Sequence, residues 1–187
     1  AEGIEYVEMD GVVPNPRLSL VKQGVELCKK EGVDFILAIG GGSAIDSSKA
    51  IAYGLANDFD LEDLFLGKVS TTKIAKIGAI STLAGTGSET SNSTVINIDT
   101  MGEKMLKRSY NHECARPLFA IMNPELTYSL PPFQTAAPGA DIMMHTMERY
   151  FTTEQHVELS DELAEGLMRT VKTFVPEALA NPKSYPA

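Results

Sequence analysis

The 187-residue sequence contains no tryptophan, only two cysteines and only three histidines. Cys28 and Cys114 stand far apart without metal-binding spacing, which disfavours a disulfide scaffold and favours free thiols in a reducing compartment. Basic residues are also scarce, because 16 Lys and Arg face 25 Asp and Glu and leave a formal net charge of -9. Such a chain repels phosphate backbones, so we expect no nucleic acid among its partners.

Long apolar runs are absent as well. No stretch is long enough to span a bilayer and no signal-peptide pattern opens the chain, so we expect a cytoplasmic protein that does not bind membranes. The length allows one domain with a sizeable core, or one domain with part of a second. The sequence begins within what reads as a strand and ends without a closing element, so it reads as a small protein or a piece of a longer one.

The other features are organised around residues 35–50. The apolar run Phe35–Ile39 predicts a strand buried on both faces, as in the centre of a parallel sheet. Gly40–Ser43 interrupt this run, and a helix is expected from about Ile45 onward. A strand, a glycine turn and a helix aim backbone N–H groups and the positive helix end at one point, which suits a phosphate. A tight turn that only packs the strand against the helix is an equal alternative, because the spacing matches neither common nucleotide fingerprint.

Apolar periodicity predicts the remaining elements. Further strands are expected at residues 6–9, 76–81, 94–98, 104–109 and 118–122, and further helices at residues 16–32, 133–151 and 160–179. The last of these helices carries one apolar stripe, formed by Leu163, Leu167, Val171 and Val175. The opening alternation of strand and helix favours a parallel sheet. Strands stop near Leu130, so we expect an α/β domain at residues 1–130 and the start of a helical domain at residues 131–187.

A second loop rich in glycine and hydroxyl groups, Thr82–Thr90, follows the strand expected at residues 76–81. Parallel strands end at one edge of a sheet, and open α/β folds bind their ligands at that edge. Two such loops at one edge favour a nucleotide site over a tight turn.

Asp141 and His145 are four residues apart on the helix expected at residues 133–151 and therefore share one face. A carboxylate and an imidazole can bind one divalent metal ion together, although a tetrahedral site needs two more ligands. An ordinary Asp–His pair on an exposed face is the alternative. We expect the two other histidines, His112 and His156, at the surface.

In combination and in order, these features resemble the iron-containing (group III) alcohol dehydrogenase family. The segments that carry the resemblance are Pro14–Pro16, Gly40–Lys49, Ala84–Glu89, and Asn123–Pro132 with the Asp141-x-x-x-His145 helix. Ser81–Ala84 and Tyr128–Pro132 are most similar to the butanol dehydrogenase and NADPH-dependent aldehyde reductase branch. The family implies a Rossmann-like dinucleotide-binding α/β domain, followed by an all-helical domain, with the active site between them.

The resemblance also implies roles for individual residues. Those implied to bind the dinucleotide are Gly41, Gly42, Ser43, Asp46, Thr82, Thr86, Ser88, Lys104, Leu126 and Leu130. Among them, Gly41–Ser43 would hold the pyrophosphate, Lys104 would reach the ribose, and Asp46 would lie near the nicotinamide as a catalytic residue. Asp141 and His145 would be the first two of four metal ligands. The remaining ligands, and the family's opening strand, are absent from this sequence, which therefore resembles about half of a family member.

The activity implied by the resemblance is hydride transfer between NADPH or NADH and a metal-bound short-chain aldehyde or primary alcohol. The metal would be Fe²⁺ or Zn²⁺, and the intact enzyme would be a homodimer. Three alternatives stay open: a glycerol dehydrogenase-like enzyme, a dehydroquinate synthase-like enzyme, and a nucleotide-binding piece without catalysis of its own. The Ala84–Glu89 loop and the Asp141–His145 pair favour the alcohol dehydrogenase, and the missing ligands imply that this chain alone is inactive.

Overall fold

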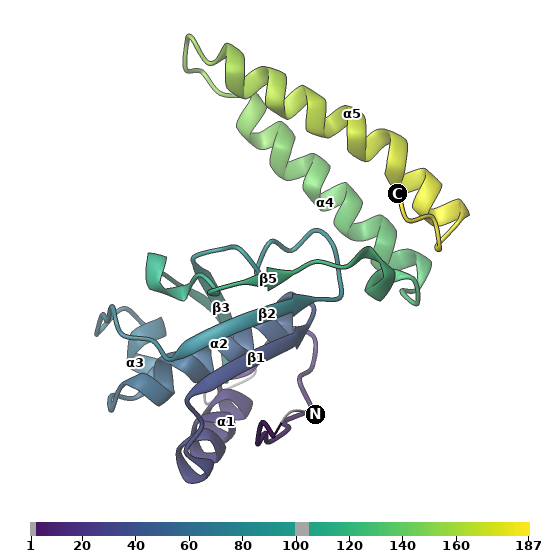
Figure 1. The fold of residues 1–187 in the computed structure, drawn as a ribbon. Coiled ribbons are helices and arrows are strands. Elements are labelled where there is room, and N and C mark those ends of the chain that lie inside the picture. Colours follow the sequence, from purple (N-terminus) through teal and green to yellow (C-terminus); the bar gives the residue numbers. More distant parts are fainter. Residues whose placement is uncertain (1–2, 100–104) are drawn as a thin grey trace. The chain divides into compact units, whose positions relative to one another are not determined.

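The computed structural model describes residues 3–99 and 105–187 (Figure 1). Its helices are α1 (Leu18–Glu31), α2 (Gly42–Ala56), α3 (Leu61–Phe65), α4 (Pro132–Tyr150) and α5 (Glu158–Ala180), with short 3-10 turns η1 (Glu113–Ala115) and η2 (Pro124–Thr127). Its strands are β1 (Phe35–Gly40), β2 (Lys76–Ser81), β3 (Ser93–Asp99), β4 (Met105–Asn111) and β5 (Ala120–Ile121). The expected elements are present with three differences: residues 6–9 form no strand, the strand expected at residues 118–122 is reduced to β5, and α2 begins three residues before the expected start near Ile45.

The chain divides into two compact units. The first consists of Ala1–Ser81 and Gly87–Ile121, and the second of Thr82–Thr86 and Met122–Ala187. The short loop after β2 is therefore grouped with the helices of the second unit rather than with the strand that precedes it.

The first unit contains a parallel sheet with the strand order β1-β2-β5, as the alternation of strand and helix predicts. The expectation that β1 is buried on both faces is wrong. Its alternate residues Phe35, Leu37 and Ile39 are 37%, 45% and 62% exposed, because β1 is an edge strand and only one face of the sheet meets α2 (Figure 1). An apolar run records hydrophobicity but not what covers each face.

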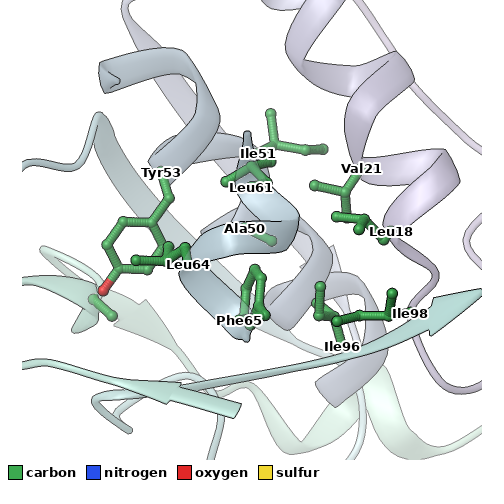
Figure 2. Close-up of a cluster of buried hydrophobic side chains, with 11 residues drawn as sticks. Leu18, Val21, Ala50, Ile51, Tyr53, Leu61, Leu64, Phe65, Ile96 and Ile98 are labelled. Carbon is green, nitrogen blue, oxygen red and sulfur yellow. The ribbon is translucent and has the colours of Figure 1, made fainter. Parts of the chain in front are cut away.

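The helix α2 is the centre of the first unit. On one side its Ile45 packs with Ala38 of β1 and Ala79 of β2. On its other sides lie apolar residues of α1, α3 and β3, several of which are visible in Figure 2, including Leu18, Leu64 and Ile96. Nine of the fifteen residues of α2 are buried, as expected for a helix that is surrounded rather than amphipathic. Polar residues on α2 are consequently buried too.

The strands β3 and β4 form the expected antiparallel hairpin, with Ser93 opposite Asn111 and Asp99 opposite Met105. The segment before α1 joins this hairpin, because the N–H of Asn97 donates to the carbonyl oxygen of Pro16 at 2.7 Å. Residues near the start of the chain are thereby attached close to the beginning of α2.

In the second unit, α4 and α5 pack along each other at close range. A Cβ added to Gly139 of α4 would lie 2.7 Å from a methyl carbon of Val175 on α5. Of the apolar stripe expected on α5, Val171 and Val175 are partly buried, while Leu163 and Leu167 are 67% and 45% exposed. Among the described residues, no helix is long and apolar enough to cross a membrane.

Candidate functional site

The turn between β1 and α2 requires glycine at its first position. Gly40 has a φ of 151°, and a Cβ there would lie 2.7 Å from the Cβ of Ala44. The next glycine, Gly41, caps α2 without a side-chain hydrogen bond, and its carbonyl accepts from the N–H groups of Ala44 and Ile45 at 3.0 and 3.2 Å. The first amides of a helix have no partner within the helix, so Gly42 and Ser43 lie where an anion is favoured.

The Ser43 hydroxyl is oriented by a residue that is distant in sequence. Its Oγ accepts a hydrogen bond from the backbone N–H of Asn15 at 3.1 Å. Asn15 lies between two prolines and has a φ of 63°, in the left-handed region that asparagine tolerates. The Ser43 hydroxyl accepts this bond through one lone pair, so its own proton can still be donated to a ligand at the helix start.

Asp46 lies one turn into α2 and is only 8% exposed. Its Oδ2 accepts from the backbone N–H of Val95 at 3.3 Å, and the Ser88 side chain also hydrogen-bonds the carboxyl group. Within residues 3–99 and 105–187, its Oδ1 has no hydrogen-bond partner. A buried carboxylate oxygen without a partner is costly, so it is a natural contact for a bound ligand.

Burial raises the pKa of Asp46 above its usual value, since the charged form loses its water shell. The nearby Lys49 ammonium opposes this, followed by the Val95 and Ser88 hydrogen bonds. Burial lowers the pKa of Lys49 in turn, against the attraction of Asp46 and Glu89. Asp46 and Lys49 therefore attract each other across one turn of α2, while burial disfavours the charge of each.

Among the described residues, the structure also brings Ser88, another implied dinucleotide residue, to Asp46. Ser88 follows Gly87, which has a φ of 66°, and it is 8% exposed. The Ser88 hydroxyl therefore hydrogen-bonds the Asp46 carboxyl group instead of facing solvent. Lys104, expected at the ribose, lies outside the described residues.

The loop that carries Thr82 and Thr86 packs against α4 within the second unit. Gly85 has a φ of 110°, and a Cβ there would lie 2.6 Å from the Cβ of Pro138. Only glycine fits this contact. Pro138 precedes Asp141 by three residues on α4. The loop that carries Thr82 and Thr86 therefore contacts α4 about one turn before the expected metal ligands.

The other second-unit residues implied to bind the cofactor lie just before α4. Leu126 is in η2 and 40% exposed, and Leu130 follows with its N–H donating to the Thr127 carbonyl at 3.0 Å. Asn123 begins η2, and its side chain accepts from the N–H of Glu125 at 3.1 Å. Asn123 and Pro124 therefore follow β5 and begin the turn η2 in which Leu126 lies.

Asp141 and His145 share one face of α4, as their spacing predicts. The His145 Nε2 is 3.7 Å from the Asp141 Oδ1, and both side chains are about 60% exposed. Two ligand atoms on one tetrahedral zinc ion stand roughly 3.5 Å apart, given ligand distances near 2.1 Å. The pair therefore fits half of a metal site. In the described part of the chain, no group of three or more His, Cys, Asp or Glu residues could complete it.

Several contacts at this site could not be predicted from the sequence. The Asn15 amide on Ser43 and the Val95 amide on Asp46 are backbone donors, which carry no signal in residue type. Lys49 reads as an ordinary helix residue, yet it is fully buried. Its carbonyl partners lie more than 40 residues away.

Comparison with known proteins identifies relatives over nearly the whole chain. A family model described as iron-containing alcohol dehydrogenase matches residues 1–124. NADH-dependent butanol dehydrogenase A of Clostridium acetobutylicum is 41% identical over 184 residues, covering 98% of this chain and 46% of that protein. NADPH-dependent aldehyde reductase YqhD of Escherichia coli is 32% identical over 187 residues, covering 98% of this chain and 48% of that protein.

A solved structure agrees with this match. NADH-dependent butanol dehydrogenase A from Thermotoga maritima superposes with a TM-score of 0.91 at 37% identity, covering 98% of this chain and 45% of that one. The chain therefore spans about half the length of the relatives that it matches.

Proposed function

This chain belongs to the iron-containing alcohol dehydrogenase family, and on that premise we propose that it carries the dinucleotide half of an aldehyde-reducing or alcohol-oxidising enzyme. The reaction of the whole enzyme is hydride transfer between NADH or NADPH and a short-chain aldehyde or primary alcohol. Within the chain, residues 1–130 form the dinucleotide-binding domain, and residues 131–187 begin the helical metal-binding domain.

The observation that carries this proposal is the buried carboxylate of Asp46 beside the start of α2. Its Oδ1 lacks a partner among the described residues, and the turn that precedes it offers the amides of Gly42 and Ser43 to an anion. A dinucleotide satisfies both features, because it has a pyrophosphate for the helix start and polar groups that can reach the carboxylate. A turn that only packs β1 against α2 would need neither.

The roles of the remaining residues follow from that placement. Gly41–Ser43 hold the pyrophosphate, with the Ser43 proton as an additional donor. By the family resemblance, Thr82, Thr86, Leu126 and Leu130 also contact the cofactor, Ser88 keeps Asp46 oriented, and Lys104 reaches the ribose. Asp46 fixes the nicotinamide end, where it orients the ring for hydride transfer.

Asp141 and His145 supply an oxygen and a nitrogen ligand to Fe²⁺ or Zn²⁺, and both ions accept such donors. A complete ligand set would hold an ion that could supply Lewis-acid chemistry to the carbonyl of the aldehyde. The side chains of this chain contribute only the positioning of that site. His145 is held one turn from Asp141 on α4, so the two donors converge without rearrangement of the backbone.

We also place the enzyme in the cytoplasm, which is supported by two free thiols at Cys28 and Cys114. For the intact enzyme we propose a homodimer and a small aldehyde or alcohol as the substrate. A second reading is a nucleotide-binding piece without catalysis. It is favoured by the exposure of Asp141 and His145, which have no third ligand in the described residues.

The decisive experiment is titration of the purified chain with NADH and NADPH, followed by the fluorescence of the reduced nicotinamide. Because the chain contains no tryptophan, the protein contributes little background. We expect saturable binding of at least one of the two cofactors, and aldehyde-dependent oxidation only when the remaining metal ligands are supplied. Absence of binding to both would overturn the proposal.

A further inference from the structure

A surface cavity of about 540 Å³ lies in the first unit, at the end of α2. It is lined by Asn57, which follows α2, by residues 70–73 before β2, and by Tyr110 and His112 at the end of β4. Its volume is typical of small-molecule sites. Ser43 lies at the opposite end of the fifteen-residue α2, about 20 Å away by the rise of an α-helix. The cavity is therefore separate from the glycine turn.

Three partly buried residues of the cavity hold one another in place. The Tyr110 hydroxyl donates to the Thr71 carbonyl oxygen at 2.9 Å and accepts from the Thr71 N–H at 3.0 Å. The Thr71 hydroxyl donates to the Asn57 Oδ1 at 2.9 Å, and the Asn57 Nδ2 donates to the Lys73 carbonyl oxygen at 3.0 Å. Because these bonds already fix the wall of the cavity, a ligand would bind without ordering it first.

The polar groups that remain for a ligand can all donate hydrogen bonds. Lys73 is exposed and forms no ion pair with a described residue. The Nδ1 of His112 accepts from the Cys114 N–H at 3.2 Å, so the ring proton lies on Nε2 and can be donated. Ser70 and Thr72 are exposed and line the same cavity. An ammonium group, an imidazole N–H and two hydroxyls favour an anion with several acceptor oxygens.

The cavity is also free of opposing charge. Among the described residues, no carboxylate lines it, although the sequence contains 25 Asp and Glu. The two carboxylates next to lining residues in the sequence are engaged elsewhere. The Asp58 Oδ1 lies 3.6 Å from the Lys29 Nζ, and Glu113 accepts from Asn92 and Arg116 at 2.6 and 2.7 Å. An anion therefore meets less repulsion here than the net charge of the chain implies.

Phe59 gives the cavity an apolar side. It lines the cavity and packs with its partly buried ring against the core of the first unit. The face of such a ring is a contact for a planar or apolar group. A ligand that uses the whole cavity consequently combines an anionic group with a ring.

We propose that this cavity binds a small organic phosphate, with its phosphate group on the donors of Lys73 and His112 and its ring against Phe59. Phosphate is favoured over carboxylate because it offers three strong acceptor oxygens to donors that come from separate segments. The site shares no residue with the glycine turn, so it does not rest on the proposed dinucleotide function.

The test uses phenyl phosphate as the probe and amide NMR spectra of the isotopically labelled 187-residue chain as the readout. We expect saturable shifts at residues 70–73 and 112. Inorganic phosphate has the anion without the ring, and benzyl alcohol has the ring without the anion, so both should bind more weakly. Benzoate, a carboxylate on the same ring, should also bind more weakly than phenyl phosphate.

Two substitutions remove single donors. Lys73→Gln should weaken phenyl phosphate binding about threefold to tenfold, because it removes a charge at an exposed position. Lys76→Gln is the matched control and should bind as wild type does, since Lys76 is an exposed lysine at the start of β2 outside the cavity lining. His112→Asn should weaken binding by a similar factor, because asparagine can still accept the Cys114 N–H but places no donor at the position of Nε2.

Equal affinity of Lys73→Gln and wild type would overturn the inference. Shifts confined to residues 41–44 would also overturn it, because the probe would then occupy the glycine turn alone. Inorganic phosphate or benzoate that binds as tightly as phenyl phosphate would overturn the assignment to an organic phosphate. These results do not depend on whether the chain binds NADH or NADPH, so a failure of this site and a failure of the proposed function are read separately.

Discussion

The backbone N–H of Asn15 donates to the Oγ of Ser43 at 3.1 Å, across 28 residues of sequence. The Asn15 amide can reach this position because its φ of 63° turns the chain between Pro14 and Pro16. The Pro-Asn-Pro segment and the glycine turn, which are separate motifs in the sequence, therefore form one structure at the start of α2.

Ser43→Ala should weaken dinucleotide binding about tenfold or more, because a hydrogen bond to a charged group contributes roughly 1.5–3 kcal/mol. The fold should persist, since the Asn15 amide lies at the surface and can bond to water. Titration with NADH and NADPH measures the loss. Ser19→Ala is the matched control, because Ser19 is an exposed serine at the start of α1 whose hydroxyl donates to Asp99. Equal affinities for the two variants would contradict a pyrophosphate at this turn.

The buried Asp46 carboxylate should lower the stability of the fold at neutral pH while it contributes to dinucleotide binding. Its pKa is raised mainly by burial, so the folded chain holds this proton more tightly than the unfolded chain. The contribution of Asp46 to stability is therefore fully present below the unfolded pKa of about 3.9 and declines as pH rises through the higher folded pKa. Asp46→Asn removes this decline, so it should be more stable than wild type at neutral pH and lose dinucleotide affinity.

Urea unfolding at several pH values from about 3.5 to 7 measures this difference. The excess stability of Asp46→Asn should grow across that interval. Asp34→Asn is a suitable control because Asp34 is exposed just before β1. If the excess stability is absent or shrinks as pH rises, the attraction of Lys49 for the ionised Asp46 outweighs the cost of burying its charge.

Much of the fold could be predicted from the sequence, and the failures have a common physical cause. Periodicity gives α1, α2, α4, α5 and the β3–β4 hairpin, because each pattern reports on its own segment. Residues 6–9 have the composition of a strand but pair with no strand in the described part of the chain, and alternate apolar residues of β1 remain exposed. Both properties depend on a neighbouring segment, which local pattern does not specify.

The same distinction applies to the site. Spacing alone places Asp141 and His145 on one face of α4, and the glycine turn marks the start of α2. The burial of the Lys49 ammonium depends on hydrogen bonds to carbonyl oxygens 42 and 44 residues away. The requirement for glycine at position 85 depends on its contact with Pro138. Tertiary contacts to backbone atoms leave no residue signature.

Metal binding by the chain itself should be weak. Asp141 and His145 are about 60% exposed and supply two of the ligands of a tetrahedral ion. After incubation with Zn²⁺ or Fe²⁺ and gel filtration, we expect close to no metal per chain, measured by elemental analysis. His145→Ala should leave that low content unchanged. Stoichiometric retention in the wild type that is lost in His145→Ala would mean that the chain completes a site on its own or with a second copy.

The close contact between α1 and α2 at Gly54 predicts that alanine at this position is destabilising. A Cβ on Gly54 of α2 would overlap a methyl group of Val25 on α1 and lie 2.9 Å from the Cδ1 of Leu61. Gly54→Ala should therefore lower the free energy of unfolding by about 1–3 kcal/mol, because stiff side chains cannot move aside in a filled core. Displacement of α2 should also move Asp46 and Lys49 away from their hydrogen-bond partners.

Gly166→Ala on α5 is the control for the helical preference of alanine itself. The nearest atom to a Cβ there is the Nη2 of Arg169 at 3.9 Å, which is an ordinary van der Waals contact, so the new methyl group fits without displacing a neighbour. That variant should gain about 0.5–1 kcal/mol, because alanine loses less backbone entropy than glycine on entering a helix. Urea unfolding followed by circular dichroism measures both. A Gly54→Ala variant as stable as wild type would show that α1 and α2 can separate without cost, and the position of Asp46 would then need another explanation.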